Sequence, residues 1–468
     1  MAKWLFAAAL MPCTPALFAA DAPSPKPFPD GARVVFFGDS ITQNGFYHPY
    51  IYEFYQTRFP SKKILMFNAG VSSGKTTDGL ARAEWDVLAK KPTDVVIMLG
   101  MNDVGTSQYT EKTGADLQKA NDKFLTRYKE NMTAIVDRLQ KEKDLRITLV
   151  ISTPYDDTSK LTTRAPAVGK NDMIRKTGDI LKAIGAEKNI PVVDFNTPLL
   201  EVNKAEQAKD PGFTIIGDDR THPRKPGHLI AAYTFLKAQG LAGPVSRTTI
   251  DAKAAKATAA NATASDLKVT TTEISWTLKE NSLPYFVDEK PESSSRPNAL
   301  DGLKYVPFNK DFNQETITVS GAPTGSWKLL IDKSEIGTYS AADLAKGIDL
   351  ADAKVATPQK TQAGKVQLLN DKRWDAERDL RSITWMKVMV FDPKNVSTSD
   401  EAAMKTAIEE WKKSSDFSEG KQKFLDAWEK GHDEATMKAI QDKVDKLTAD
   451  IYAANQPVPH AYQLVKAP

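Results

Sequence analysis

Residues 34–42 read Val-Val-Phe-Phe-Gly-Asp-Ser-Ile-Thr, and this stretch decides the fold. Its first four residues are apolar and do not alternate with polar ones, which indicates a short strand buried on both faces of a sheet. The strand leads directly into the turn Gly38-Asp39-Ser40. Open parallel sheets form their sites at the carboxyl ends of strands, so Ser40 lies where a reactive side chain is expected. A Gly-Asp-Ser tripeptide alone is a common surface turn, so Ser40 needs partners to become a candidate nucleophile.

Four more apolar runs repeat this pattern in the first half of the chain. Segments with helical periodicity separate them, chiefly 113–141 and 173–188, and a last helix is expected between Pro226 and Gly240. Repeated strand–helix units imply an α/β fold, in which a parallel sheet has helices on both faces. The five strands are expected at 34–37, 64–68, 95–99, 147–152 and 192–195.

The bulk composition excludes several classes of partner. The 468 residues are too many for one ordinary domain, so two or three domains are expected. The net charge is only +3 at pH 7, which gives no reason to expect a nucleic acid as partner. After the N-terminal segment no apolar run reaches the ~20 residues that a membrane span needs, so no span is expected.

The first 20 residues have the pattern of a secretory signal peptide. Lys3 precedes an apolar run over 4–10, and small residues end the segment at Ala19 and Ala20. The alternative is a buried N-terminal helix, against which two prolines argue. Cleavage near Ala20 would remove the one cysteine, Cys13, and leave no disulfide or cysteine-based metal site. We therefore expect an exported protein, periplasmic or extracellular.

A histidine near an aspartate supplies the first partner for Ser40. His222 lies in Asp219-Arg220-Thr221-His222-Pro223, where a three-residue offset in a turn can bring the carboxylate to the imidazole. Asp219 would then accept a hydrogen bond from Nδ1 and leave Nε2 free to take a proton. The other histidines lack a matching acid or lie in the charged tail: His48, His228, His432 and His460.

Two further loops carry polar groups at the ends of expected strands. Asn68-Ala69-Gly70-Val71-Ser72-Ser73-Gly74 follows the second strand, and Gly100-Met101-Asn102-Asp103 follows the third. Because the carboxyl ends of parallel strands share one edge of the sheet, both loops should converge on Ser40. A glycine N–H and an asparagine amide are suitable donors to a developing oxyanion.

Taken together, these blocks resemble the SGNH (GDSL-like) hydrolases, a superfamily of serine esterases and lipases. All four family blocks occur in the family order within residues 33–240, about half of the chain. The resemblance implies a flavodoxin-like three-layer α/β/α fold with a parallel sheet, and a catalytic triad of Ser40, His222 and Asp219. It implies no metal and no cofactor. An ordinary α/β-hydrolase fits less well, since Gly38-Asp39-Ser40-Ile41-Thr42 does not complete its Gly-x-Ser-x-Gly elbow.

The same resemblance assigns an oxyanion hole. Its donors would be the backbone N–H of Ser40, the backbone N–H of Gly74 and the side chain of Asn102. Gly70 competes with Gly74 for this role, because the loop after the second strand contains both glycines.

The second half of the chain differs in character from the first. Short strand-like runs indicate a β-rich module, which we interpret as a packing domain; the alternatives are carbohydrate binding or a wall of the substrate cleft. The charged helical tail, with four tryptophans as possible anchors, is interpreted as a solvated amphipathic pair. The expected boundaries are a signal peptide at 1–20, a catalytic domain at 30–245, a helical connector at 246–266, a β-rich module at 267–350 and a mainly helical region at 351–468.

The expected function is that of a serine esterase. We expect removal of small acyl groups, chiefly acetyl, from a carbohydrate, so that the partner is an ester substrate such as an acetylated glycan. A lipid or aryl ester hydrolase of the same fold is the first alternative, and it needs a wide apolar cleft. A catalytically silent glycan-binding protein is the second, and the joint presence of Ser40, Asp219 and His222 argues against it.

Overall fold

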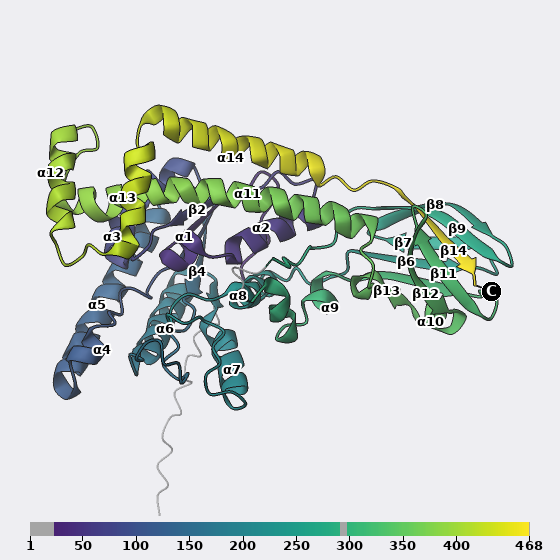
Figure 1. Ribbon diagram of the computed structural model, residues 1–468, viewed down its shortest axis with the longest axis horizontal. Coiled ribbons are helices and arrows are strands. Elements are labelled where there is room, and N and C mark those ends of the chain that lie inside the picture. Colours follow the sequence, from purple (N-terminus) through teal and green to yellow (C-terminus); the bar gives the residue numbers. More distant parts are fainter. Residues whose placement is uncertain (1–22, 291–296, 468) are drawn as a thin grey trace, which may run out of the picture.

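The computed structural model describes residues 23–290 and 297–467. The expected signal peptide at 1–20 lies outside these residues. Figure 1 shows an α/β domain, a β-rich module at one end of the molecule, and a long helix, α11 (Pro358–Met386), that extends from the module across the α/β domain. The α/β domain and the β-rich module are therefore connected in two ways, by the chain that runs directly between them and by α11.

The sheet of the α/β domain is parallel and five-stranded, as the sequence predicts. Its strand order is β2-β1-β3-β4-β5, the flavodoxin-like arrangement. Gly38, the last residue of β1, pairs with Gly70 of β2 and with Met98 of β3, so the three expected loops begin at one edge. The strands are β1 (Arg33–Gly38), β2 (Leu65–Gly70), β3 (Asp94–Met98), β4 (Arg146–Ile151) and β5 (Val192–Asp194).

Helices cover both faces of this sheet. The two long helical patterns of the sequence form α5 and α6, and α8 begins with a proline in its first turn, as expected from Pro226. The helices of the domain are α1 (Ser40–Asn44), α2 (Tyr47–Arg58), α3 (Thr76–Arg82), α4 (Gln108–Glu111), α5 (Gly114–Leu139), α6 (Lys170–Lys188), α7 (Asn196–Gln207) and α8 (Lys225–Ala238).

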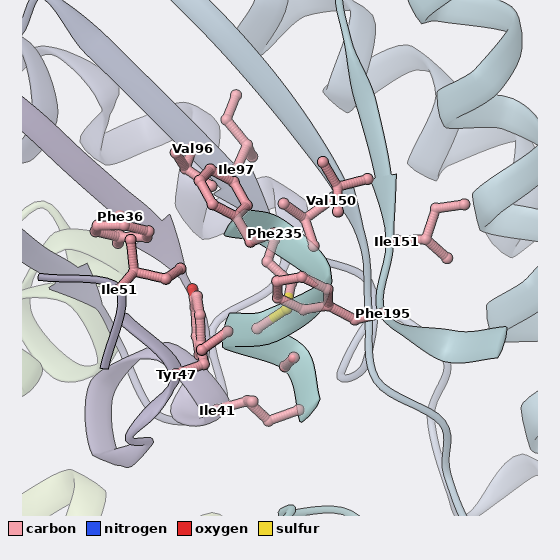
Figure 2. Packing of buried hydrophobic residues seen from close by; sticks show 14 of the residues in the cluster. Phe36, Ile41, Tyr47, Ile51, Val96, Ile97, Val150, Ile151, Phe195 and Phe235 are labelled. Atoms are coloured by element: carbon pink, nitrogen blue, oxygen red, sulfur yellow. The ribbon is translucent and has the colours of Figure 1, made fainter. Parts of the chain in front are cut away.

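Aromatic side chains fill the space between the sheet and the helices beside the first strand. Phe36 of β1 packs edge-on against Tyr47 of α2, with 5.8 Å between ring centroids, and lies 6.4 Å from Phe235 of α8. Figure 2 shows these three rings with Ile41 and Phe195 around one packed interior. Because such rings bury much apolar surface on folding, they fix β1, α2 and α8 relative to one another.

The expected helical connector at 246–266 is wrong, because this segment forms strands. It contains β6 (Ser246–Asp251), β7 (Lys256–Ala260) and the start of β8 (Ala262–Val269). The alanines and lysines favour a helix by intrinsic propensity. The segment 246–251 instead forms β6, which pairs with β10 (Glu315–Ser320), and every second side chain of β6 is buried.

The β-rich module consequently begins at Ser246, and it also includes the end of the chain. One sheet has the order β13-β10-β6-β7 and the other β12-β11-β14-β9-β8. The last strand, β14, lies between β11 and β9, and Figure 1 shows it returning from the helical region. The other elements of the module are β9 (Glu273–Glu280), β11 (Ser326–Ile331), β12 (Ser334–Ser340), α10 (Ala341–Lys346), β13 (Ile348–Asp349) and β14 (His460–Lys466). The short helix α9 (Phe308–Phe312) packs instead in the apolar core of the α/β domain.

The helical region contains α11 and three further helices: α12 (Glu401–Lys412), α13 (Glu419–Gly431) and α14 (Glu434–Ala454). Trp385, Trp411 and Trp428 are buried in one apolar cluster, which also contains Val71 from the α/β domain. The interpretation of this region as a solvated pair is wrong for α11, because one face of that helix is buried against the α/β domain. Throughout the described ranges, none of the helices is both long and apolar enough to cross a membrane.

Candidate active site

Ser40 is the first residue of α1, and one residue, Asp39, separates it from the end of β1. Asp39 caps this helix, since its Oδ1 accepts a hydrogen bond from the N–H of Ile41 at 2.9 Å. Burial raises the pKa of Asp39 to about 6, although the Ile41 N–H opposes this shift. A Cβ on Gly38 would lie 2.1 Å from Thr42 Oγ1, so only glycine allows the turn to close this tightly. Ser40 is thus fixed by a capped helix start.

His222 and Asp219 join Ser40 in one hydrogen-bonded chain. His222 Nε2 lies 2.7 Å from Ser40 Oγ, and His222 Nδ1 lies 2.6 Å from Asp219 Oδ2. Burial raises the pKa of Asp219, but the hydrogen bond and the charge of His222 outweigh burial and hold it well below its ordinary value. Asp219 is therefore a carboxylate that can hold the imidazole with Nε2 facing the serine.

The turn that carries this pair is held by Arg220. Arg220 is fully buried and has φ +64°, a left-handed conformation that few non-glycine residues adopt. Asp219 Oδ1 accepts the N–H groups of Thr221 and His222, each at 3.0 Å, which completes the turn. The Arg220 guanidinium donates to four carbonyl oxygens of a neighbouring loop, those of Asp156, Ser159, Leu161 and Arg164.

The other histidines do not reach Ser40 or Asp219 through hydrogen bonds. His48 donates from Nε2 to the carbonyl of Thr42, and burial lowers its pKa to about 4. Burial likewise lowers the pKa of His228 to about 3; this residue lies in the first turn of α8, as expected. Of the five histidines, His222 is the one placed to act as a base toward Ser40.

The loop after β2 meets Asn102 near the expected oxyanion hole. Asn102 Nδ2 donates to the carbonyl of Gly74 at 3.1 Å. The Gly74 N–H donates to the carbonyl of Val71 at 2.9 Å, and the Gly70 N–H donates to Asn68 Oδ1 at 2.8 Å. Both expected backbone donors are therefore engaged within the protein, and Gly74 could serve an oxyanion only by leaving Val71.

The Ser73 N–H differs from the other backbone N–H groups of this loop. The N–H groups of Val71 and Ser72 bond to Gly38 O and Gln43 Oε1, whereas that of Ser73 has no partner in the described chain. Ser73 also has φ +65°, a left-handed conformation that is uncommon for a residue other than glycine. The sequence analysis considered only the glycines of this loop, because glycine is the residue type most tolerant of positive φ.

Known protein families match both halves of this chain. The GDSL-like Lipase/Acylhydrolase family matches residues 36–230, and the Diltiazem deacetylase C-terminal helical domain matches residues 364–456. The solved structure of a gut microbial diltiazem-metabolizing enzyme is 33% identical and has a TM-score of 0.87, covering 95% of this chain and 100% of that one. The chain belongs to the GDSL-like (SGNH) hydrolases.

A curated relative supports the same assignment for the first half of this GDSL-like hydrolase. An acetylxylan esterase of Geobacillus stearothermophilus is 29% identical over 229 residues, which cover 45% of this chain and 94% of the relative. With the family match, these relatives make the protein an ester-hydrolysing enzyme.

A cavity of about 630 Å³ opens at Ser40 and His222 of the hydrolase. Its wall on the α/β side includes Asn44 and Phe46. The opposite wall comes mainly from α11, with a lysine from α13: Asp371, Trp374, Asp375, Arg378 and Lys423. The C-terminal wall is therefore provided mainly by the helical region, with Lys290 from the segment that follows β9.

The α11 wall combines one aromatic side chain with charged ones. Trp374 packs against Phe46 with 4.8 Å between ring centroids, and the Arg378 guanidinium lies 4.5 Å from the Trp374 ring centroid. Arg378 also bonds to Asp375 at 3.0 Å. Burial, and then the charge of Asp288, raise the pKa of Asp371 to about 6. Sequence reasoning noted Trp374 only as an anchor, since no local motif marks a pocket wall made by a distant helix.

Proposed function

We propose that this GDSL-like hydrolase is a serine esterase in which Ser40 is the nucleophile, His222 the general base and Asp219 the orienting carboxylate. The observation that carries the proposal is the chain of two hydrogen bonds, 2.7 Å from Ser40 Oγ to His222 Nε2 and 2.6 Å from His222 Nδ1 to Asp219 Oδ2. These distances fall within the range in which a proton passes between nucleophile and base.

The proposed reaction has two halves. Ser40 Oγ attacks the ester carbonyl while His222 Nε2 removes its proton, and Asp219 stabilises the imidazolium that forms. The protonated His222 then gives its proton to the departing alcohol, leaving an acyl group on Ser40. Water, deprotonated by His222, attacks this acyl-enzyme and releases the acid, which restores Ser40 and the neutral imidazole.

Hydrogen-bond donors beside Ser40 would stabilise the negative oxygen of each tetrahedral intermediate. Ser40 N–H lies in the first turn of α1, where no carbonyl of the helix accepts it. Asn102 Nδ2 and one N–H of the loop 70–74 complete the set. The family block assigns the loop donor to Gly74, and the N–H of Ser73 is the group available without breaking a bond.

We propose acetyl esters of a polyhydroxylated alcohol, such as an acetylated glycan, as the substrate class. The cavity at Ser40 is lined mostly by polar and charged side chains, which suit hydroxyl groups better than an acyl chain of a lipid. The acetylxylan esterase relative and the deacetylase domain of residues 364–456 both point to the acetyl group.

A panel of acetylated substrates tests this proposal. Acetate release should be measured from acetylated xylan, other acetylated polysaccharides and an aryl acetate, beside a p-nitrophenyl ester series from acetyl to dodecanoyl. We expect the acetyl esters to give the highest kcat/KM, with a steep fall as the acyl chain lengthens. A preference for long acyl chains would instead favour a lipid esterase, and the absence of all ester hydrolysis would favour a silent binding protein.

We also propose that the enzyme is exported to the periplasm or beyond. The charge, apolar run and small residues of the first 20 positions support this location. Mass spectrometry of the protein from fractionated cells should find a mature N-terminus close to position 21. An intact Met1 in the cytoplasmic fraction would contradict export.

A further inference from the structure

The helix α11 lies along the free edge of the parallel sheet. β2 is the edge strand of the order β2-β1-β3-β4-β5, so one row of its backbone groups has no strand to pair with. Figure 1 shows α11 passing beside β2. Buried backbone groups require partners, and here the side chains of a helix supply them.

Four side chains of α11 bond to backbone groups along this edge. Arg373 Nη2 donates to the carbonyl of Met66 at 2.6 Å, and Glu377 Oε1 accepts the N–H of Asn68 at 2.8 Å. The next two bonds follow in the same direction. Arg381 Nε donates to Gly70 O at 2.9 Å, and Trp385 Nε1 donates to Ser72 O at 2.8 Å.

The spacing of these bonds is regular. The side chains are four residues apart on the helix, and their targets are two residues apart on the strand and the loop after it. Four helical residues rise ~6 Å, and two strand residues rise ~6.6 Å. The two repeats therefore match closely enough for one helix face to follow the strand for four steps. All four α11 side chains are buried.

The bonds from Arg381 and Trp385 hold the loop 70–74. That loop touches the proposed machinery on two sides. Asn44 Nδ2 bonds both to Ser72 Oγ, at 3.2 Å, and to the carbonyl of Ser40, at 3.1 Å. Farther along, Asn102 Nδ2 bonds to Gly74 O at 3.1 Å.

We infer that Arg381 and Trp385 are positioning residues for the reaction, because they fix the loop 70–74 relative to Ser40 and Asn102. The inference rests on the proposed function. Neither side chain lines the cavity at Ser40, so both act through the backbone of the loop. A displaced loop moves an oxyanion donor, and displacements near 1 Å can cost about a hundredfold in rate. The C-terminal helical region thereby contributes to kcat as well as to stability.

Trp385→Phe isolates this effect. The substitution removes the Nε1–H that holds Ser72 O but keeps an aromatic ring against Phe424, which lies 4.4 Å away by ring centroids. Trp411→Phe is the matched control, since Trp411 packs in the same cluster, 5.6 Å from Trp385, and no described contact links its indole to the loop. Arg381→Lys is the second variant. Lysine keeps the positive charge, but its single ammonium group cannot donate to Gly70 O and at the same time form a two-bond ion pair with a carboxylate.

The measurements are kcat and KM for p-nitrophenyl acetate, the melting temperature, and the affinity for a small alkylboronic acid. The boronic acid forms a tetrahedral adduct with a serine and so reports on the oxyanion hole, whereas the product acetate reports on the ground state. For full-length Trp385→Phe we expect kcat to fall about tenfold or more, with KM within about twofold. Boronate affinity should fall with kcat, and acetate affinity should stay constant. Arg381→Lys should change kcat and boronate affinity in the same way.

The control decides the outcome. If Trp411→Phe keeps the wild-type kcat while Trp385→Phe loses it, the positioning role is supported. A folded Trp385→Phe enzyme with the wild-type kcat and boronate affinity would overturn it, as would an equal loss in Trp411→Phe, which would mean that packing alone matters. The two proposals fail in different ways. If the positioning role is wrong, the wild-type protein is still an esterase that depends on Ser40. If the proposed function is wrong, ester hydrolysis survives the removal of Ser40.

Discussion

Arg381 of α11 and Asp86 of the α/β domain form a two-pronged ion pair, with Nη–Oδ distances of 2.6 and 2.7 Å, although 295 residues separate them in sequence. Asp86 also accepts a bond from Arg82 Nη1 at 2.6 Å, so one buried carboxylate is shared by two buried guanidinium groups. Arg82 in turn donates to Gly38 O and Ala69 O at the ends of β1 and β2. The charge cluster thus connects the helical region to both strands that lead into the site.

Asp86→Asn should destabilise the protein by roughly 3–5 kcal/mol at pH 7, because it leaves two buried guanidinium groups without their counter-charge. Denaturant unfolding of both proteins measures this difference. The control is Asp442→Asn, which removes an exposed partner of Lys438 and should cost less than ~1 kcal/mol. Equal costs at the two positions would contradict a structural role for the cluster.

The same substitution should show a pH dependence of defined sign. Burial raises the pKa of Asp86, but Arg381, Lys90 and Arg82 outweigh burial and hold it well below its ordinary value. A carboxyl with a lowered folded-state pKa stabilises the fold above its unfolded pKa of about 3.9, and this contribution is lost as pH falls further. The stability difference between wild type and Asp86→Asn should therefore be constant near neutrality and shrink below about pH 4.

His222→Ala should abolish ester hydrolysis, whereas His228→Ala should leave much of the chemistry intact. His222 is the one histidine bonded to Ser40, while His228 lines the cavity and is buried. Because the base must be neutral, wild-type kcat/KM should rise with pH over the range in which an imidazole loses its proton. Loss of activity in His228→Ala with retention in His222→Ala would reverse the assignment.

Asn102→Ala should lower kcat about 10²–10³-fold with a much smaller change in KM, because an oxyanion contact strengthens in the transition state. Steady-state kinetics on p-nitrophenyl acetate separates the two parameters. Asn131→Ala is a useful control, since Asn131 Nδ2 bonds to Thr76 Oγ1 on the other side of the same loop region. An unchanged kcat in Asn102→Ala would remove this residue from the site.

A chain that ends at residue 245 should aggregate or melt at a much lower temperature than the full protein. Without α11 the edge of β2 loses its partners, and Val71 loses the apolar cluster that buries it. Size-exclusion chromatography and thermal unfolding test this. A monomeric, cooperatively folded product as stable as the full chain would show that the two halves are independent.

The α/β fold and the Ser40, Asp219 and His222 grouping could be predicted because each rests on local sequence. Five apolar runs without alternation predict buried parallel strands, and a motif that begins where such a strand ends must lie at the site edge. The strands appear within a residue or two of the expected positions. The Asp219–His222 offset likewise needs only one turn to become a contact.

The remaining features depend on contacts between distant residues. The spacing of Arg373, Glu377 and Arg381 is four residues, which is typical of charges on a solvated helix face. The sequence around them does not indicate that they bond to the edge of a strand. The 246–266 segment has helix-favouring composition, and only its pairing with β10 makes it a strand. The sequence around Arg220 does not distinguish it from a surface arginine, because its burial depends on the four carbonyl groups of a distant loop to which its guanidinium donates.

The central claim is that Ser40 carries out ester hydrolysis, and the turnover of p-nitrophenyl acetate by purified Ser40→Ala tests it most directly. Because members of a triad act as a unit, kcat should fall on the order of 10³-fold or more. The melting temperature should stay close to that of the wild type, since Ser40 makes its side-chain bond to His222 at the edge of the cavity. A folded Ser40→Ala protein that turns over the ester at the wild-type rate would contradict the account.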